Sequence, residues 1–119
     1  MIHTQKYNAV KTVLYGIKFD SKIESKFYQY FKDKGVRVLE LQPTFLLQDS
    51  FKLDWKTIRK IEYSADFCIE YEWDRFYIDV KGMRTPVFDL KLKLWKRRYW
   101  QENILLIVKS FKDLENQLK

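Results

Sequence analysis

The chain has 119 residues, which is enough for one domain with a hydrophobic core and too few for two. Hydrophobic residues make up 46% of the sequence and aromatic residues 18%, with only 3 Gly and 2 Pro, so the composition excludes a disordered chain and long flexible linkers. The formal net charge of +7 indicates a polyanionic partner, and nucleic acid is favoured over an anionic membrane because no amphipathic terminal helix stands apart from the core.

Membrane segments, export signals and structural zinc are not predicted. No apolar run approaches the roughly 18 residues of a membrane span, and the first residues, MIHTQKYNAVK, lack the apolar centre of a signal peptide. We therefore expect a cytoplasmic protein that does not contact a membrane. Cys68 and His3 are the only residues of their kinds, so the sequence excludes an internal disulfide and a structural zinc site, and any metal would be held by oxygen.

Residues 1–19 are basic and aromatic, show no clear period, and contain a predicted turn at Tyr15-Gly16. Two interpretations of this N-terminal arm are open: its lysines follow a phosphate backbone, or its aromatic side chains pack on the domain. Packing is favoured, and it leaves the lysines free to touch phosphate. These lysines are Lys6, Lys11 and Lys18.

The segment DSKIESKFYQYFKDKG, residues 20–35, predicts a helix that begins at Asp20 or Ser21 and ends at Gly35. Glu24 follows Ser21 by three residues, the spacing of a capping box, in which the Glu side chain binds the backbone N–H at the start of the helix. The alternative is that Glu24 leans toward the sheet and adds a third carboxylate to the acidic residues of the strands.

After this helix, VRVLELQPTFLLQ is rich in β-forming residues and interrupted by Pro43, so two strand segments are expected at about 36–41 and 44–48. Gln42 lies at their junction, where it is interpreted as a turn residue, with a role in a site as the alternative. Residues 49–57 are interpreted as a polar connection to the next strand.

The stretch EYSADFCIEYEWDRFYIDVKG, residues 62–82, predicts two alternating strands joined by a turn. If the turn centres on Glu72 and Trp73, residues whose numbers sum to 145 lie opposite each other, which pairs Asp66 with Asp79 at a Cβ separation of roughly 5 Å. A three-residue turn without a bulge would instead turn Asp66 to the other face of the sheet.

Acidic and basic side chains of this hairpin are expected to share one face. Successive side chains of a strand point to opposite faces, so Asp79 and Lys81 emerge together, while Asp66 lies in a polar set and Tyr63 in an apolar set on the opposite face. Like charges opposite each other on a sheet need a compensating partner, for which a divalent cation is suited. The alternative is a surface salt-bridge cluster of Lys81 with the two aspartates.

The C-terminal third predicts a helix, a strand and a short helix. The helix begins at Thr85 and Pro86 and runs to about Gln101. Two interpretations of its basic residues are open and equally favoured. They form a solvated face, or they bind phosphate within two turns of the carboxylates. The run NILLIVKS predicts a buried strand parallel to the second strand of the hairpin, and FKDLENQLK predicts a terminal helix, so the chain is expected to be an α/β fold around one mixed sheet.

Asp66 and the triplet Asp79-Val80-Lys81, separated by twelve residues, resemble the D…(D/E)xK arrangement of the PD-(D/E)XK nuclease superfamily. The predicted order of elements agrees with that superfamily, although Ala65 stands where it often has Pro. The chain more closely resembles a small phage-type family related to RecU-like Holliday-junction resolvases. This resemblance covers most of residues 6–94 through KYNAVKT, YGIKFDSKIESKFY, LELQP, YSADF and DVKGMRT.

The resemblance implies a single nuclease domain, residues 1–119, with a restriction-endonuclease-like core: a mixed central sheet whose antiparallel hairpin is flanked by helices. It implies that Asp66 and Asp79, with the backbone carbonyl of Val80, bind Mg²⁺ or Mn²⁺. Glu24 becomes a further metal ligand or a group that positions water.

Two more roles follow from the resemblance. Lys81 orients or activates the attacking water or stabilises charge, and Gln42 contacts the site. The residues expected to bind DNA are Lys6, Lys11, Lys18, Lys22, Gln42, Arg84, Lys93, Lys96 and Arg97.

The leading functional hypothesis is a metal-dependent endonuclease that cleaves four-way junctions or other branched DNA as a homodimer, since two symmetric incisions need two active sites and one chain supplies one. A non-catalytic DNA-binding or partner-binding protein on a nuclease fold is the first alternative. A sequence-specific or end-processing nuclease is the second, although the short chain has no insertion for reading bases, which favours recognition of DNA shape.

Overall fold

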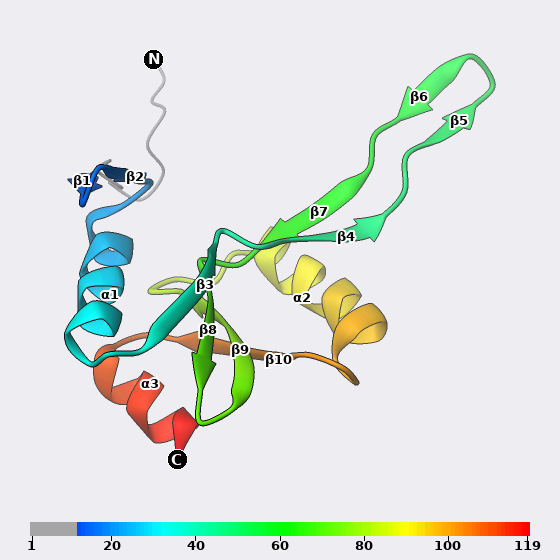
Figure 1. Cartoon of the computed structure of the whole chain (residues 1–119). Coiled ribbons are helices and arrows are strands. Elements are labelled where there is room, and N and C mark those ends of the chain that lie inside the picture. Colours follow the sequence, from blue (N-terminus) through cyan, green and yellow to red (C-terminus); the bar gives the residue numbers. More distant parts are fainter. Residues whose placement is uncertain (1–11) are drawn as a thin grey trace.

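Three helices enclose a four-stranded mixed sheet in a layered α/β fold (Figure 1). The computed structural model describes residues 12–119. The helices are α1 (Lys22–Asp33), α2 (Pro86–Tyr99) and α3 (Phe111–Leu118). Helices α1 and α3 cover one face of the sheet, where Phe27 and Leu114 are fully buried, and α2 covers the other face with Leu92 and Trp95.

The central sheet has the strand order β10-β9-β8-β3. Its strands are β3 (Arg37–Leu41), β8 (Phe67–Tyr71), β9 (Asp74–Val80) and β10 (Ile104–Val108). Strand β8 pairs antiparallel with both β3 and β9, and the chain returns through α2 to place β10 parallel to β9. The predicted mixed α/β class and the parallel position of the NILLIVKS segment are therefore confirmed.

The β8–β9 hairpin has the register that the sequence predicted. Its pairs run from Phe67 opposite Ile78 to Tyr71 opposite Asp74, and the two turn residues, Glu72 and Trp73, have φ angles of 50° and 75°. Two successive residues with positive φ are typical of a type I′ turn, which matches the twist of the strands. The ladder ends at the pair of Phe67 and Ile78, and the N–H of Asp66 donates to the carbonyl of Ile78, so the predicted ladder pair of Asp66 with Asp79 is not formed.

Both long helices begin as predicted. Ser21 is the N-cap of α1 and its hydroxyl accepts the backbone N–H of Glu24 at 3.2 Å. Thr85 caps α2 by accepting the N–H of Phe88 at 3.1 Å, and Pro86 occupies the first helical position, where its missing N–H costs nothing. Helix α2 ends at Tyr99, two residues before the predicted end.

The predicted strand across residues 62–71 is wrong as one element, because the chain bends at Ala65-Asp66. Before the bend, β7 (Ile61–Ser64) pairs with β4 (Thr44–Gln48), and after it β8 pairs with β3. The opposite strand bends at Gln42-Pro43, where Gln42 has a φ of 50° and Pro43 has no N–H for a ladder. Backbone bonds from Gln42 N to Asp66 O and from Ala65 N to Pro43 O, at 2.9 and 3.0 Å, keep the pairing in register through the bend.

The bend also changes which face the side chains reach. Tyr63 and Ala65 join the core beneath α2, whereas Phe67 and Ile69 join the core beneath α1 and α3. The prediction that Tyr63 points away from the acidic residues is therefore wrong. Strict alternation holds only within an unbroken strand, and it does not extend across a change of direction.

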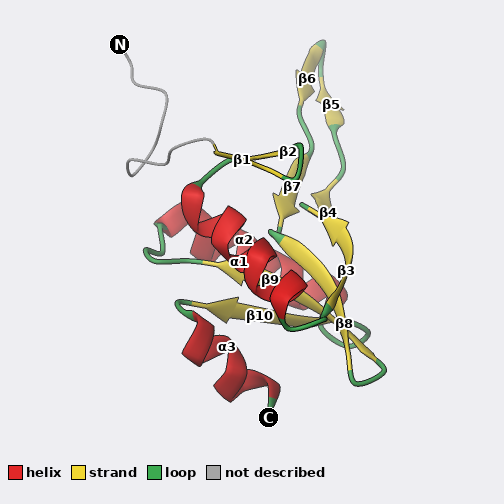
Figure 2. Cartoon of the chain, turned by 60° about the vertical axis from the view of Figure 1, so that its left-hand side comes forward, coloured by secondary structure: helices red, strands yellow, loops and turns green. Residues whose placement is uncertain are grey.

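The predicted polar connection at residues 49–57 is also wrong, because these residues continue the hairpin as β5 (Phe51–Leu53) and β6 (Lys56–Ile58). Strands β5 and β6, residues 51–58, form an arm that projects from the body of the protein in both views (Figures 1 and 2), beyond β4 and β7, which pack against α2. The side chains of residues 51–57 are exposed on both faces, so no alternation of polar and apolar residues marks these strands.

The described part of the N-terminal arm forms a small hairpin of β1 (Thr12–Leu14) and β2 (Ile17–Phe19). Its turn lies at Tyr15-Gly16 as predicted, and Phe19 is buried, which supports the packing interpretation. Lys6 and Lys11 lie outside the described residues. Over residues 12–119, no helix is both long enough and apolar enough to cross a bilayer.

We expect Trp73→Gly to stabilise the protein by about 1 kcal/mol, because glycine adopts positive φ without the steric cost of a Cβ atom. Trp73 is 96% exposed, so its removal sacrifices little packing. Urea unfolding followed by circular dichroism measures the change. Trp55→Gly is the matched control: Trp55 is also a highly exposed hairpin residue, but its φ is not positive, so no gain is expected there. An equal gain in both variants would contradict the explanation.

Candidate functional site

The bend places Asp66 beside the end of β9. The Asp66 N–H donates to the carbonyl of Ile78 at 2.9 Å, and the Asp66 Oδ2 accepts the N–H of Val80 at 2.8 Å. These two bonds hold the Asp66 carboxylate next to that of Asp79. Because the N–H and C=O of one residue share a side in an antiparallel ladder, the carbonyl of Val80 points toward β8 as well.

Asp79 is the buried centre of the site, with a relative exposure of only 1%. Its Oδ2 accepts a hydrogen bond from the hydroxyl of Tyr63 and lies 3.4 Å from the ammonium nitrogen of Lys81. Among the residues that the structure describes, no group hydrogen-bonds its Oδ1. A buried carboxylate oxygen without a partner is costly, so it marks a position where a ligand would be stabilised.

Tyr63 is a site residue that the sequence analysis missed. Burial raises the pKa of the Tyr63 hydroxyl, and the neighbouring Asp79 raises it further, so the hydroxyl stays protonated and donates to Asp79. The sequence gives no indication of this role, because the alternating pattern places Tyr63 among the apolar side chains of its strand. Only the bend between Tyr63 and Asp66 brings both to Asp79.

Lys81 and Arg84 lie against the same aromatic ring at the start of α2. The Lys81 nitrogen is 4.8 Å from the centroid of the Phe88 ring, and the Arg84 guanidinium carbon is 5.3 Å from it. Arg84 also pairs with Asp89 at 3.0 Å. The ring therefore holds two cations beside the carboxylates through cation–π contacts.

Mutual repulsion and burial disfavour the charged form of Asp66. Burial raises the pKa of Asp66 well above its usual range, and the charges of Asp79 and Glu24 raise it further, whereas the hydrogen bond from Val80 N–H lowers it. Lys81 is the only cation paired with Asp79 in residues 12–119. One ammonium group does not balance the carboxylates gathered here.

Glu24 reaches the same region from α1. Glu24, Gln42 and Asp66 line a pocket of about 130 Å³, hereafter the carboxylate pocket, with Lys18 of β2 at its wall. Burial raises the pKa of Glu24 and the charge of Asp20 adds to this, while hydrogen bonds from Ser21 and Gln42 lower it.

Glu24 also takes part in the cap of α1, though in a different way from the prediction. Its Oε2 accepts the Ser21 hydroxyl at 3.3 Å, in place of the backbone N–H that a capping box would supply. Glu24 therefore bonds the N-cap side chain of α1 and also lines the carboxylate pocket. Gln42 likewise serves two neighbours, because its Nε2 donates to the Oδ2 of Asp20 at 3.0 Å.

The other predicted DNA-binding residues lie on separate surfaces. Lys22 lines a hollow between the starts of α1 and α3 with Lys26 and Lys109, two lysines that the sequence analysis did not single out. Lys96 and Arg97 occupy the last turn of α2, so the expectation that they lie within two turns of the carboxylates is wrong. Lys96 is ten helical steps after Pro86, which places it about 15 Å along the axis from the start of α2.

A complete metal site is not assembled in the described residues: nowhere in residues 12–119 are three His, Cys, Asp or Glu side chains already arranged as ligands. The oxygen groups available to a cation are the carboxylates of Asp66 and Asp79, the carbonyl of Val80 and, across the carboxylate pocket, Glu24.

Residues 4–115 match the family model described as Protein of unknown function (DUF1064). The chain belongs to this family. Comparisons with curated proteins and with solved structures gave no match. Membership of DUF1064 specifies no reaction, so the chemistry of this member has to be derived from its site.

We expect Asp66→Asn to raise the melting temperature at pH 7.5 in the absence of divalent cations, by roughly 4 °C if it removes about 1 kcal/mol of repulsion. The pKa of Asp66 is raised in the folded protein, so the folded state is favoured when Asp66 is protonated at acidic pH. This stabilisation of the folded state is lost as the pH rises through that pKa. Asparagine keeps an acceptor for the Val80 N–H and carries no charge.

Thermal unfolding of both proteins from pH 4 to pH 8 measures this effect. The advantage of the variant should shrink toward about pH 4, where aspartate itself becomes protonated. Asp74→Asn is the control, since Asp74 is exposed at the far end of β9. Equal stability of wild type and Asp66→Asn at pH 7.5 would contradict the raised pKa.

Proposed function

We propose that this DUF1064 protein is a metal-dependent DNA endonuclease with a restriction-endonuclease-like core. The observation that carries the proposal is the arrangement around Asp79, whose buried Oδ1 has no partner in residues 12–119, beside the carboxylate of Asp66 and the ammonium group of Lys81. The order of the elements, a helix with Glu24, the hairpin, α2 and β10, supports the core assignment.

The residues fit Mg²⁺ or Mn²⁺. Hard divalent cations prefer carboxylate and carbonyl oxygens, and the donors here are Asp66, Asp79 and the carbonyl of Val80. A cation would supply the partner that Asp79 Oδ1 lacks and would offset the repulsion that raises the pKa of Asp66. The carboxylate pocket, at about 130 Å³, has room for water beside Asp66 and Glu24.

Each residue around the carboxylates has a separate task in phosphodiester hydrolysis. A bound divalent cation supplies a water of lowered pKa and neutralises charge on the phosphate. Lys81 stabilises the negative charge that develops on the phosphate or orients the attacking water, and Glu24 positions water in the pocket. Tyr63 is a positioning residue, because its hydroxyl holds the Oδ2 of Asp79 and leaves the Oδ1 free.

A salt-bridge cluster without a ligand explains the arrangement less well. Lys81 approaches only the Oδ2 of Asp79 and has no contact that would neutralise Asp66 or Glu24. A purely structural ion pair gains nothing from gathering further carboxylates around it, since each one adds repulsion and a desolvation cost.

DNA is the proposed substrate because cations surround the carboxylates and the chain carries a net charge of +7. Lys18 lines the carboxylate pocket, and Arg84 lies beside Lys81 on the Phe88 ring. Four-way junctions or other branched DNA are the preferred substrates, cleaved in the cytoplasm by a homodimer, since paired incisions need two copies of this single site.

Cleavage of fluorescently labelled four-way junctions, flaps and linear duplex of the same sequence tests the proposal. With Mg²⁺ or Mn²⁺ the wild-type protein should cut junctions fastest, and Asp66→Asn or Asp79→Asn should reduce cleavage by about a hundredfold or more. Binding of DNA should persist or tighten in both variants, because a negative charge facing phosphate is removed. Circular dichroism verifies that the variants fold.

The protein would be a non-catalytic DNA-binding protein if it bound these substrates in a salt-dependent way and cut none of them with either metal. Equal cutting of junction and linear DNA would instead favour an end-processing or sequence-specific nuclease. Thermal shift gives a readout apart from cleavage: Mn²⁺ should raise the melting temperature of the wild type and leave that of Asp66→Asn unchanged.

The two roles of Glu24 can be separated with a pair of variants. Glu24→Gln keeps an acceptor for the Ser21 hydroxyl but loses the charge, so it should lower cleavage by about tenfold or more with little change in stability. Ser21→Ala removes the cap of α1 and should cost about 1 kcal/mol of stability with cleavage retained. Full activity of Glu24→Gln would assign Glu24 to capping alone.

A further inference from the structure

A groove of about 620 Å³ lies at the outer edge of the sheet, between the end of α2 and the start of β10. We call it the edge groove. It lies at the far end of β10 from the proposed nuclease site, because Ile104 pairs with Phe76 whereas Val108 pairs with Val80 beside Asp66. The cations Lys96 and Arg97, which the nuclease site does not use, line this groove.

Strand β10 is an edge strand that is only half covered. Its last part is closed by α3, because the N–H of Lys109 donates to Asp113 Oδ2 at 2.9 Å and Gln117 Nε2 donates to the carbonyl of Ile107 at 3.0 Å. Figure 1 shows α3 beside this end of β10 and the end of α2 at the other. Uncovered edges of sheets are templates on which another strand can pair.

The backbone groups that remain open can be identified from the ladder. The carbonyl of Val108 accepts the N–H of Lys81, so Val108, Leu106 and Ile104 direct their backbone groups toward β9. Leu105 and Ile107 therefore direct theirs outward. The N–H and C=O of Leu105 and the N–H of Ile107 have no hydrogen bond within residues 12–119, which is enough for a short added strand.

The side chains around these open groups are apolar and basic. Trp100 and Ile104, 62% and 43% exposed, contribute apolar surface, and Lys96 and Arg97 contribute positive charge. No acidic side chain is among the described residues that line the groove. We infer that the edge groove binds an extended peptide of a partner protein, with apolar side chains interspersed with carboxylates, as a strand added to β10.

One residue that lines the groove carries a buried donor without a partner in residues 12–119. Trp95 is only 3% exposed, lines the groove, and its indole N–H has no acceptor among the described residues. Buried donors are almost always paired in folded proteins, so the wall lacks one acceptor. Carbonyl or carboxylate oxygens are what a peptide brings.

Two other occupants fit less well. A second copy of this chain would bring its own Lys96 and Arg97 to the same edge and a net charge of +7. Nucleic acid would suit the two cations but has no alternating N–H and C=O groups to match Leu105 and Ile107.

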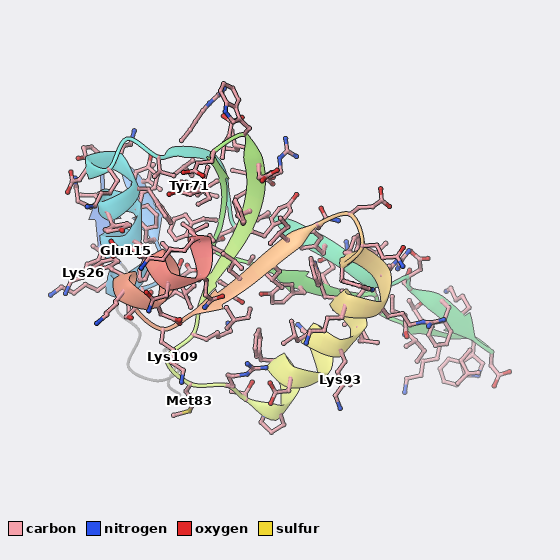
Figure 3. The ribbon with its side chains drawn as sticks, turned by 90° about the horizontal axis from the view of Figure 1, so that it is seen from below. Lys26, Tyr71, Met83, Lys93, Lys109 and Glu115 are labelled. Carbon is pink, nitrogen blue, oxygen red and sulfur yellow. The ribbon has the colours of Figure 1, made fainter. Side chains whose placement is uncertain are left out.

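Fluorescence anisotropy with the labelled peptide Asp-Asp-Val-Glu-Phe-Glu-Ile-Asp tests the inference on the full chain. The double variant Lys96→Glu with Arg97→Glu should weaken binding roughly tenfold or more. Lys91→Glu with Lys93→Glu is the control of equal charge on the same helix, and it should bind nearly as the wild type does. Lys93 projects from α2 away from the sheet (Figure 3).

Amide and indole NMR signals locate the peptide. Binding should shift the amides of Leu105 and Ile107 and the indole N–H of Trp95, and methylation of alternate peptide nitrogens should abolish binding by removing the strand bonds. No binding below about 1 mM, or equal weakening by both double variants, would overturn the inference. A third result would also overturn the inference: a labelled oligothymidine binds where the peptide does not, and only the Lys96→Glu, Arg97→Glu variant weakens its binding. None of these measurements involves cleavage, so they stand or fall apart from the proposed nuclease activity.

Discussion

Two backbone hydrogen bonds, from Gln42 N to Asp66 O and from Ala65 N to Pro43 O, keep the long hairpin in register where it changes direction. Before the bend the strands pair beneath α2, and beyond it β8 joins the central sheet. Asp66 lies at the point where the chain passes from one pairing to the other. Its peptide groups bond on both sides, to Gln42 and to Ile78, so the position of its carboxylate is set by backbone geometry.

The same bend determines the electrostatics of the site. It brings the Tyr63 hydroxyl to one oxygen of Asp79 and leaves the other oxygen without a partner in the described residues. Burial and repulsion then raise the pKa of Asp66. Such an arrangement lowers the free energy of unfolding of the protein without a ligand. Binding sites commonly have this property, because the bound ligand relieves the repulsion. Geometry and charge therefore support the same proposal of a cation between the aspartates.

Helix α2 connects two surfaces with different chemistry. Its first turn presents Phe88 to Lys81 and Arg84 beside the carboxylates, and its last turn presents Lys96 and Arg97 to the edge groove. The basic run along this helix is thus divided between two ends rather than forming one face. The proposed nuclease chemistry and the proposed peptide docking can accordingly be changed independently by substitution.

The sequence by itself determined the mixed α/β class, the caps at Ser21 and Thr85, and the register of the β8–β9 hairpin from Phe67 to Ile78, because capping and two-residue turns depend on a few neighbouring residues. Only the tertiary structure decided the bend, the strands of the arm and the place of Tyr63 at Asp79. The pairing of Gln42-Pro43 with Ala65-Asp66 joins segments more than twenty residues apart, and an arm with both faces in water carries no alternating pattern, so neither feature is encoded in local periodicity.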